Sequence, residues 1–480
     1  MYTLLIIASL YLLASLSCLA QDRVKYPFLA VQKAGVNKLM VIEDGIAALQ
    51  LRVDMIRRAK KSIEVEYFIF NTDTAGKIIA TELVAAAKRG VKVRVLVDKS
   101  IAVFKLKLHF AKELARQRVD LRYYNAAEIF HISSIQFRNH RKLLSVDDVE
   151  ALTGGRNIGD DYFDLSHEFN FNDRDIHVKG PIVKAMRESF ERFFYHKITQ
   201  KPDLTEEVSE KNQHLARALL KEGPAGKAAR KRMESVGREI LAKTKSHTCP
   251  VTTFASDAPG GEFSTRLDPE FGRTHRHLRN VLRSKINQVD KRLILSSPYM
   301  IHNERTQGIF NMLLAKKVKI HLHTNSLAST DAIYVAANLY ISMQDWLNRG
   351  VQIYLHDGQW PGFNPQTPLM IRQARWGTHG KTQIYESKKF SEVMIGTYNV
   401  DNRSNFYNTE MAIFCRGNDE LTNEVKQHIV NLTEKSLKVL VNGTAIGKNG
   451  KIQNVYGTDK KEITKMRIAT VPSWLVKFLL

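Results

Sequence analysis

The chain has 480 residues, enough for two or three domains and for a large hydrophobic core without covalent staples. Hydrophobic residues make up 44% and charged residues 25%, a globular composition that excludes disorder, collagen and coiled coil. The 72 lysines and arginines exceed the 49 aspartates and glutamates, and the resulting charge of +23 favours an anionic partner: nucleic acid, an acidic membrane surface or a phosphorylated substrate.

The N-terminal residues 1–20 contain an uncharged apolar stretch that ends in small side chains. Its length fits the apolar region of a signal peptide with its cleavage site, and it is marginal for a bilayer span. We expect a signal peptide that is cut after Ala20 and exports the protein to a bacterial cell envelope, in the periplasm or against a membrane. Two alternatives are a lipid-modified Cys18, which would make a lipoprotein, and an uncleaved anchor.

Cysteine occurs only at positions 18, 249 and 415. The chain has no Cys-x-x-Cys pair, which excludes a zinc ribbon and a disulfide framework. If Cys18 is removed with the leader, Cys249 and Cys415 remain, and we expect them to be buried free thiols rather than a disulfide.

Strands alternate with helices in both halves of the chain. In the first half, 61–70 predicts a strand rich in β-branched and aromatic side chains, 75–90 a helix and 91–98 a buried parallel strand. The second half repeats this order, with a strand at 291–300, a helix around 306–316, a strand at 318–324, a helix at 331–350 and a strand at 351–357. The alternation predicts an α/β fold with parallel sheet, and its repetition predicts a duplicated domain.

We therefore divide the chain into two α/β domains, residues 40–200 and 248–440. The segment 201–247 between them is polar, charged and helix-prone, and we interpret it as a helical linker or surface insertion. Residues 441–480 are turn-rich and basic, and we interpret them as a C-terminal surface extension.

A histidine and a lysine two residues apart occur at matching places in the two halves, His140 with Lys142 and His379 with Lys381. In an extended strand, side chains at i and i+2 share a face, so each pair projects into one space. Each pair is followed by a carboxylate and then by a glycine-containing turn that ends in asparagine. These residues are Asp147 and Asn157 in the first half, and Glu386 and Asn399 in the second.

Two imidazoles, two ammonium groups and two amides describe a pocket for a tetrahedral phosphate. One histidine can attack phosphorus while the other protonates the leaving oxygen, and the lysines and asparagines can stabilise charge on the phosphoryl oxygens. No carboxylate cluster has metal-ligand spacing, so we expect no metal and no cofactor. One His-x-Lys pair alone would most simply be a surface pair on an edge strand; the repetition favours catalysis.

The doubled motif resembles the phospholipase D superfamily, whose signature is H-x-K-x4-D-x6-G-[GS]-x-N in each of two halves. The resemblance extends from about residue 40 to residue 420. The stretches 154–163, 324–331 and 396–410 also resemble the bacterial cardiolipin synthase branch. The resemblance implies two pseudo-repeated α-β-α domains that share one active site at their interface.

The resemblance also implies a role for each motif residue. His140 would be the nucleophile that forms a phosphohistidine, and His379 the general acid and then the base. The phosphoryl oxygens would be bound by Lys142, Lys381, Asn157 and Asn399.

A carboxylate would orient each histidine and fix its tautomer. The family takes this carboxylate from the strand after the glycine–asparagine turn. The matching residue is Glu410 in the second half and Asp175 in the first, with Glu168 as an alternative.

The sequence departs from the family pattern at three places. Glu386 stands where the motif has aspartate, and the loop from Glu386 to Gly396 is three residues longer than usual. Because this motif position, Asp147 in the first half, is mainly a structural anchor, we expect glutamate to be tolerated. Gly155 replaces a hydroxyl residue that Thr397 retains, so the first site loses one phosphate hydrogen bond. We expect both sites to be competent.

We expect a phosphatidyltransferase or phospholipase D that acts on glycerophospholipid phosphodiesters, similar to cardiolipin synthase. Its partners would be an anionic phospholipid, phosphatidylglycerol, and the membrane surface, and the protein would be a monomer. The alternative is a nuclease that cleaves DNA or RNA, which the charge of +23 also suits. A third interpretation, a membrane-binding protein with a decayed site, is disfavoured by the intact histidines and lysines.

Overall fold

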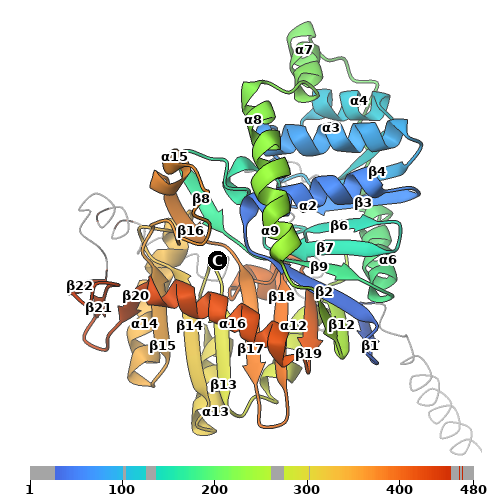
Figure 1. The fold of residues 1–480 in the computed structure, drawn as a ribbon. Coiled ribbons are helices and arrows are strands. Elements are labelled where there is room, and N and C mark those ends of the chain that lie inside the picture. The colour runs from blue at the N-terminus through green and yellow to red at the C-terminus, as the bar shows by residue number, and fades with distance from the viewer. Residues whose placement is uncertain are drawn as a thin grey trace, which may run out of the picture.

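The computed structural model describes residues 28–100, 104–125, 137–260, 275–301 and 303–455, together with Thr464 and Ile468. Two large mixed sheets, one for each half of the chain, form the frame of the molecule (Figure 1). The predicted signal segment 1–20 lies outside the described residues. Within the described ranges, no helix is both long and apolar enough to span a bilayer.

The first sheet has nine strands, of which three central ones are parallel and the others antiparallel. Its order is β10 (Thr199–Gln200), β5 (Val119–Tyr124), β4 (Lys92–Asp98), β3 (Ser62–Tyr67), β6 (Leu143–Val146), β7 (Glu150–Gly154), β9 (Asp175–Lys179), β2 (Asn37–Ile42) and β11 (His247–Cys249).

The second sheet has eleven strands and repeats the central pattern of the first. Its order is β1 (Leu29–Gln32), β12 (Val251–Ser256), β19 (Met411–Arg416), β18 (Ser391–Gly396), β17 (Lys381–Glu386), β13 (Arg292–Ser296), β14 (Lys319–Asn325), β15 (Gln352–His356), β20 (Leu437–Val439), β21 (Thr444–Ile446) and β22 (Ile452–Asn454). The parallel trio β13–β14–β15 corresponds to β3–β4–β5, and the antiparallel run β17–β18–β19 corresponds to β6–β7–β9. The predicted α/β class and the duplication are confirmed.

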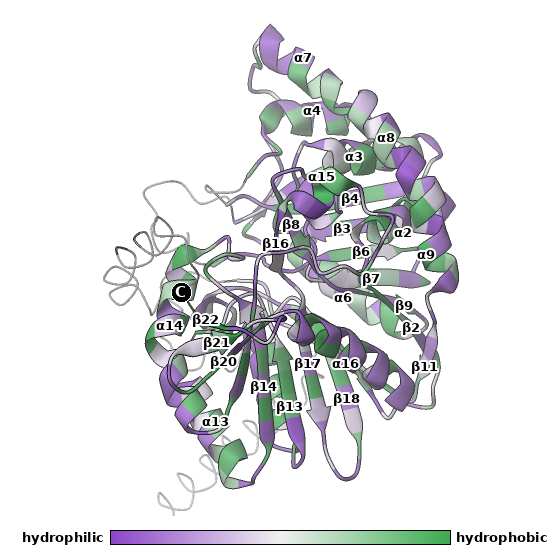
Figure 2. Cartoon of the chain, turned by 60° about the vertical axis from the view of Figure 1, so that its left-hand side comes forward, coloured by the Kyte–Doolittle hydropathy of each residue, from purple (hydrophilic) through white to green (hydrophobic). Residues whose placement is uncertain are grey.

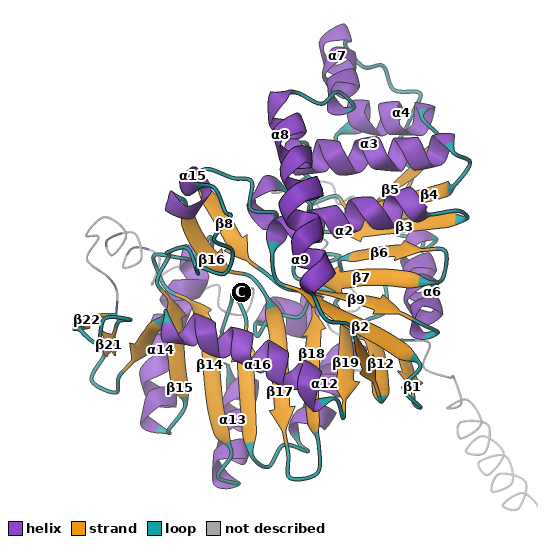
Figure 3. Ribbon diagram, in the orientation of Figure 1, coloured by secondary structure: helices purple, strands orange, loops and turns teal. Residues whose placement is uncertain are grey.

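Helices cover both faces of each sheet (Figure 3), and the strands between them carry many hydrophobic residues (Figure 2). On the first sheet, α2 (Gly45–Arg58) and α3 (Thr74–Lys88) cover one face and α6 (Ile182–Phe194) the other. On the second sheet, α12 (His277–Ile286), α13 (Glu304–Ala315) and α14 (Ile333–Asn348) cover one face and α16 (Asp419–Glu434) the other. Asp44 and Asp73 begin α2 and α3 because their side chains accept backbone N–H groups of the first turn.

The two halves share one hydrophobic core, to which both sheets contribute. Leu143 and Ile176 of the first sheet belong to the same buried cluster as Ile384 and Ile413 of the second, and α6 and α16 complete it. Because this apolar surface is buried only when the halves are together, the hydrophobic effect fixes them against each other.

Each sheet also takes an edge strand from the other half of the chain. The N-terminal strand β1 pairs with β12 in the second sheet, whereas β11, which follows the segment 201–247, pairs with β2 in the first. Cys249 at the end of β11 forms a disulfide with Cys415 of β19, with the two Cα atoms 5.8 Å apart. The expectation of free thiols is therefore wrong. The sequence could not show it because the two cysteines are 166 positions apart and are brought together only by the pairing of β11, β12 and β19.

The segment between the halves is helical and packs on the first half. It contains α7 (Glu210–Leu219), α8 (Pro224–Arg232), a π-helical turn η2 (Met233–Gly237) and α9 (Arg238–Lys243). Leu219, Ala229 and Met233 of this segment are buried in the core formed with α2 and α3. Past residue 440, β21 and β22 continue the edge of the second sheet.

Candidate active site

The two His-x-Lys pairs lie at equivalent places in the two sheets. His140 and Lys142 lead into β6, which runs antiparallel to β3, so they lie at the carboxyl end of β3. His379 and Lys381 lead into β17 and lie at the carboxyl end of β13 in the same way. The carboxyl ends of parallel strands are the usual place for a ligand site in an α/β fold.

Backbone hydrogen bonds between the halves hold both histidines. The backbone N–H of His140 donates to the carbonyl oxygen of Thr409 at 3.1 Å, and that of His379 donates to Asn172 at 2.8 Å. The segment before His379 is β16 (Arg375–Thr378), which pairs in parallel with β8 (Phe169–Asn172) of the first half. Each histidine is therefore positioned by the half of the chain to which it does not belong.

The carboxylate that contacts each histidine also comes from the opposite half of the chain. Nδ1 of His140 lies 3.0 Å from both carboxylate oxygens of Glu410, and Nδ1 of His379 lies 2.6 Å from Oδ2 of Asp173. All four side chains are buried. With Nδ1 committed to a carboxylate, Nε2 is the nitrogen of each ring that remains for chemistry.

Asp173, not Asp175, is the carboxylate in the first half. Asp175 instead accepts from Arg52 and Arg156, and the alternative residue Glu168 is exposed. The register explains the two-residue error: Gly154 pairs with Asp175 as Gly396 pairs with Ala412, so the residue equivalent to Glu410 in the first half is Asp173. A comparison of the two strand ladders would have found it, but the sequence motif alone does not include them.

The two lysines lie next to the histidines and are fully buried. Nζ of Lys142 donates to the carbonyl oxygen of His140 at 2.7 Å. Nζ of Lys381 donates to the carbonyl oxygen of His379 at 2.7 Å and lies 2.9 Å from Nε2 of that ring. Burial lowers the pKa of Lys381 to about 8. Burial also lowers the pKa of Lys142 well below its ordinary value, and repulsion from Lys381 lowers it further.

The asparagines that end the two turns are also buried in the site region. Asn157 is held on both sides: its Oδ1 accepts from the backbone N–H of Ile69 at 3.2 Å, and its Nδ2 donates to the hydroxyl of Tyr162 at 2.9 Å. Asn399 receives no hydrogen bond at Oδ1 from any described residue. The structure thus brings together eight polar side chains, four from each half: His140, Lys142, Asn157, Asp173, His379, Lys381, Asn399 and Glu410.

The two carboxylates differ in their ionisation. Burial raises the pKa of Glu410 to about 7, against the attraction of Lys142. Burial also acts on Asp173, but His379, Lys381 and Arg156 outweigh it and hold the pKa of this carboxyl below its ordinary value. At neutral pH, Asp173 is ionised, whereas Glu410 titrates.

Both imidazoles are disposed to be neutral in the absence of an anion. Burial, followed by repulsion from Lys381, lowers the pKa of His379 to about 4. Burial and the positive charges of Lys142 and Lys381 lower the pKa of His140. An anionic phosphodiester between the lysines would offset this repulsion and raise both pKa values.

Aromatic rings that the sequence motif does not contain form walls beside the histidines. The rings of Phe171 and Tyr162 lie 4.7 and 5.2 Å from that of His379, and the ring of Phe68 lies 5.4 Å from that of His140. They contribute to the burial of the two histidines.

Asp147 and Glu386 lie away from this site, at the opposite ends of β6 and β17. The side chain of Asp147 accepts the backbone N–H groups of residues 60, 61 and 62. Glu386 pairs with Lys426 at 2.5 Å and with Arg292 at 3.5 Å. The contacts of both residues are those of sheet anchors, as expected for this motif position.

Gly155 and Thr397 occupy the same motif position but serve the two carboxylates differently. The hydroxyl of Thr397 donates to Glu410. A Cβ atom on Gly155 would lie 2.0 Å from Oδ1 of Asp173, so glycine is required for the approach of that carboxylate. The absence of a hydroxyl at Gly155, which we expected to cost a phosphate hydrogen bond, is what allows Asp173 to approach.

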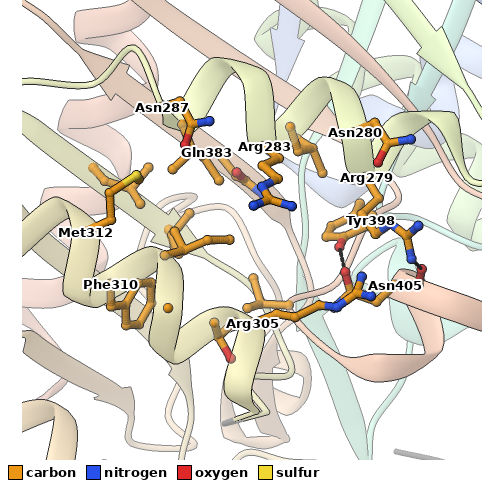
Figure 4. Close-up of a pocket in the computed structure, with 18 of the residues that line it drawn as sticks. Arg279, Asn280, Arg283, Asn287, Arg305, Phe310, Met312, Gln383, Tyr398 and Asn405 are labelled. Atoms are coloured by element: carbon orange, nitrogen blue, oxygen red, sulfur yellow. Dashed lines mark hydrogen bonds between the residues drawn. The ribbon is translucent and has the colours of Figure 1, made fainter. Parts of the chain in front are cut away.

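A separate cavity of about 770 Å³ lies between α12 and α13, on the outer face of the second sheet (Figure 4). Tyr398 and Asn405, joined by a hydrogen bond of 2.6 Å, form one end of it. Neither His140 nor His379 lines this cavity.

Among the described residues, no group of histidine, cysteine or acidic side chains is arranged to hold a metal ion. Two half-sites of histidine, lysine, asparagine and carboxylate, brought together by a duplicated α/β fold, define a phospholipase D-like protein. The chain matches the family model described as cardiolipin synthase, PLD-like domain, over residues 53–194 and 282–433, which together are more than half of its length. The chain belongs to this family.

Three known proteins illustrate the similarity. An uncharacterised protein of Helicobacter pylori is 28% identical over 393 residues, which cover 78% of this chain and 75% of that protein. Cardiolipin synthase C of Escherichia coli is 28% identical over 415 residues, covering 80% of this chain and 82% of that enzyme. The crystal structure of phosphatidylserine synthase from Haemophilus influenzae matches with a TM-score of 0.62 and 14% identity, over 92% of this chain and 95% of that one, and supports the fold.

Proposed function

We propose that this protein is a phosphatidyltransferase that joins a phosphatidyl group to an alcohol through a phosphohistidine intermediate. The observation that carries this proposal is the pair of imidazoles whose Nδ1 atoms are bound to carboxylates of the opposite halves. This arrangement leaves Nε2 of each imidazole off the carboxylates, and the mutual repulsion of Lys142 and Lys381 places the two half-sites near each other. The family similarity supports the same chemistry.

In the first step, Nε2 of His140 attacks phosphorus and forms an N–P bond. The bond from phosphorus to the leaving alcohol oxygen breaks, and His379 gives its Nε2 proton to that oxygen. Lys142 and Lys381 stabilise the phosphoryl oxygens as the charge on them increases.

In the second step, the neutral His379 removes the proton of an acceptor hydroxyl. The acceptor oxygen attacks phosphorus, the N–P bond breaks, and His140 returns to its neutral form. When the acceptor is water, the product is phosphatidic acid; when it is the glycerol headgroup of another lipid, the product is a transferred phosphatidyl group.

The difference between the two carboxylates supports this division of roles. A general acid must carry a proton, and the ionised Asp173 stabilises an imidazolium at His379. A nucleophile must be neutral, and Glu410, whose pKa is raised to about 7, stabilises positive charge at His140 less.

We propose phosphatidylglycerol as the substrate and cardiolipin as the product. The support is the similarity to proteins named cardiolipin synthase and the charge of +23, which concentrates anionic lipid at the surface. The test is to incubate the purified protein with labelled phosphatidylglycerol in vesicles and to separate the lipids. Cardiolipin and glycerol are expected, and activity should persist in EDTA. Rapid cleavage of DNA or RNA with every phospholipid left intact would replace the proposal by a nuclease.

We further propose that the protein is exported to a bacterial envelope and acts there as a monomer. The disulfide between Cys249 and Cys415 supports export, because disulfides persist in oxidising compartments. N-terminal sequencing should find a chain that begins near Gln21 or a lipid on Cys18. An intact Met1 in a cytosolic fraction, with both thiols free, would refute export.

A further inference from the structure

A strap of the second half, residues 357–378, crosses from β15 to the first half and ends beside His379. Nδ2 of Asn364 donates to Asp44 at 2.7 Å, and Nε2 of Gln366 donates to Glu239 at 3.1 Å, so the strap rests on α2 and α9. Its last part is β16, which pairs with β8. The strap therefore connects the surface of the molecule directly to the catalytic residues.

The outermost element of the strap is the short helix α15 (Leu369–Gln373), which presents two large apolar side chains to solvent. Leu369 is 59% exposed and Met370 61%. The helix is held by Ile371, which is buried and whose carbonyl oxygen accepts from Nε1 of Trp376 at 3.0 Å. The helix that carries Leu369 and Met370, α15, lies at the top of the second half in Figure 1 and is labelled again in Figure 2.

Beside α15 is an open cavity of about 700 Å³ whose lining includes Arg372, Arg375 and Lys448, with Asp357 as its one carboxylate. No ion pair joins these three cations to a described residue: Nζ of Lys448 donates to Oε1 of the neutral Gln359, and the buried Nε of Arg372 has no hydrogen-bond partner among the described residues. The guanidinium groups lie over aromatic rings instead, Arg372 over Trp360 at 5.3 Å and Arg375 over Phe169 at 4.7 Å.

We propose that this face, Leu369 and Met370 with the basic cavity of Arg372, Arg375 and Lys448, is the surface by which the protein sits on an anionic lipid bilayer. The apolar side chains would enter the interface between headgroups and acyl chains, and the three cations would bind headgroup phosphates. The proposal rests on the proposed function, since it names the membrane contact of the same active site.

The size and the chemistry of the face favour a bilayer over other partners. A stable protein partner needs about 800 Å² on each side, which two apolar side chains do not supply. Nucleic acid would use the cations but has no apolar region for Leu369 and Met370. A lipid bilayer offers both an anionic layer and an apolar layer at adjacent depths.

The test is co-sedimentation of the full-length protein with vesicles of phosphatidylcholine alone and of phosphatidylcholine with 30% phosphatidylglycerol (about this proportion suffices for a surface charge). The double variant Leu369→Asp, Met370→Asp should bind the anionic vesicles at least about tenfold more weakly. The matched control is Val149→Asp, Ile341→Asp, which places the same charges on side chains that are 59% and 54% exposed elsewhere, and it should bind as the wild type does.

The cations are tested separately. The triple variant Arg372→Gln, Arg375→Gln, Lys448→Gln should lose on the order of 100-fold in affinity for anionic vesicles, about fivefold for each cation, and most of its preference over phosphatidylcholine. The control is Lys38→Gln, Lys184→Gln, Lys319→Gln, three exposed lysines on other surfaces. Free inorganic phosphate at millimolar concentration should not displace the protein from vesicles; displacement would mean that the cavity is a site for soluble phosphate.

Three results would overturn the proposal: wild-type binding by both test variants, equal losses in the controls, or tighter binding to a DNA oligonucleotide that depends on the cations alone. If an aspartate variant fails to fold, Leu369→Ser with Met370→Ser gives the same comparison with a smaller change. The assay requires no turnover. Vesicle binding without lipid conversion would therefore reject the proposed function only, and lipid conversion with unaltered binding by the variants would reject the docking face only.

Discussion

The two half-sites lie at equivalent places in the two sheets but have different carboxylates. His140 faces Glu410, which also accepts from the hydroxyls of Thr397 and Ser404, whereas His379 faces Asp173 at 2.6 Å. The pKa of Glu410 is raised to about 7 and that of Asp173 is lowered. The two halves of the duplicated fold thus differ in the negative charge beside each imidazole. A nucleophile and a general acid require such a difference.

The largest expected effect comes from removal of either histidine. His140→Ala and His379→Ala should each lower turnover of phospholipid by at least about 10²–10⁴-fold with the fold intact. A phosphodiester with a nitrophenol leaving group should separate the two, because this leaving group needs no proton. His379→Ala should still form a covalent adduct, detected by intact mass, and His140→Ala should not. The reverse result would exchange the roles.

Neutral replacements of the carboxylates should give unequal losses. Asp173→Asn should lower kcat by about 10²-fold or more, because it removes a full negative charge and favours the wrong tautomer of His379. Glu410→Gln should cost about tenfold at pH 7, since this carboxyl is already half protonated there. Kinetics of both variants on the same substrate test this order. Equal losses of kcat would mean that the two carboxylates have the same role.

Substitutions of the residues beside the carboxylates should lower activity less, again more on the Asp173 side than on the Glu410 side. Gly155→Ala places a methyl group 2.0 Å from Oδ1 of Asp173, so we expect about a tenfold loss of activity and a decrease of about 1–3 kcal/mol in the free energy of unfolding. Thr397→Ala removes one hydroxyl donor to Glu410 and should cost only a few-fold. Urea unfolding and steady-state kinetics measure both. A harmless Gly155→Ala would contradict the packing role given to this glycine.

The pH dependence of activity should reflect Glu410 rather than Asp173. Because the pKa of Glu410 is raised to about 7, its ionised form is lost as the pH falls below 7, and activity should fall with it. Activity should also fall above about pH 8, as Lys381 loses its proton. The rate–pH profile of Glu410→Gln should lack the acidic limb. An acidic limb that persists in this variant would assign it to another group.

The motif residues could be predicted from the sequence because their chemistry is local. A histidine and a lysine at i and i+2 share a face in any extended segment, and their repetition before a glycine–asparagine turn made the common phosphate pocket a specific prediction. The regular strands and helices could also be predicted: predicted strand 91–98 is β4 (Lys92–Asp98), and predicted helix 331–350 is α14 (Ile333–Asn348).

The features that could not be predicted all depend on pairing between distant segments. Asp173 and Asp175 are both acidic and two residues apart, and only the register of β7 with β9 decides which of them reaches a histidine. The exchange of carboxylates between halves and the disulfide of Cys249 with Cys415 need the sheet order as well. Asp147 and Glu386 share the motif with the histidines and lysines but lie at the other end of the strands, which a linear signature does not show.

The exchange of β1 and β11 between the two sheets makes the halves of the chain complementary as fragments. A cut within 201–247 would leave an N-terminal piece that carries an edge strand of its partner's sheet, and a C-terminal piece that carries one in return. Each piece alone would expose unpaired strand edges, the usual starting point of aggregation. Produced together, the two pieces can donate these strands to each other, so this site is suited to a split reporter whose signal requires reassembly.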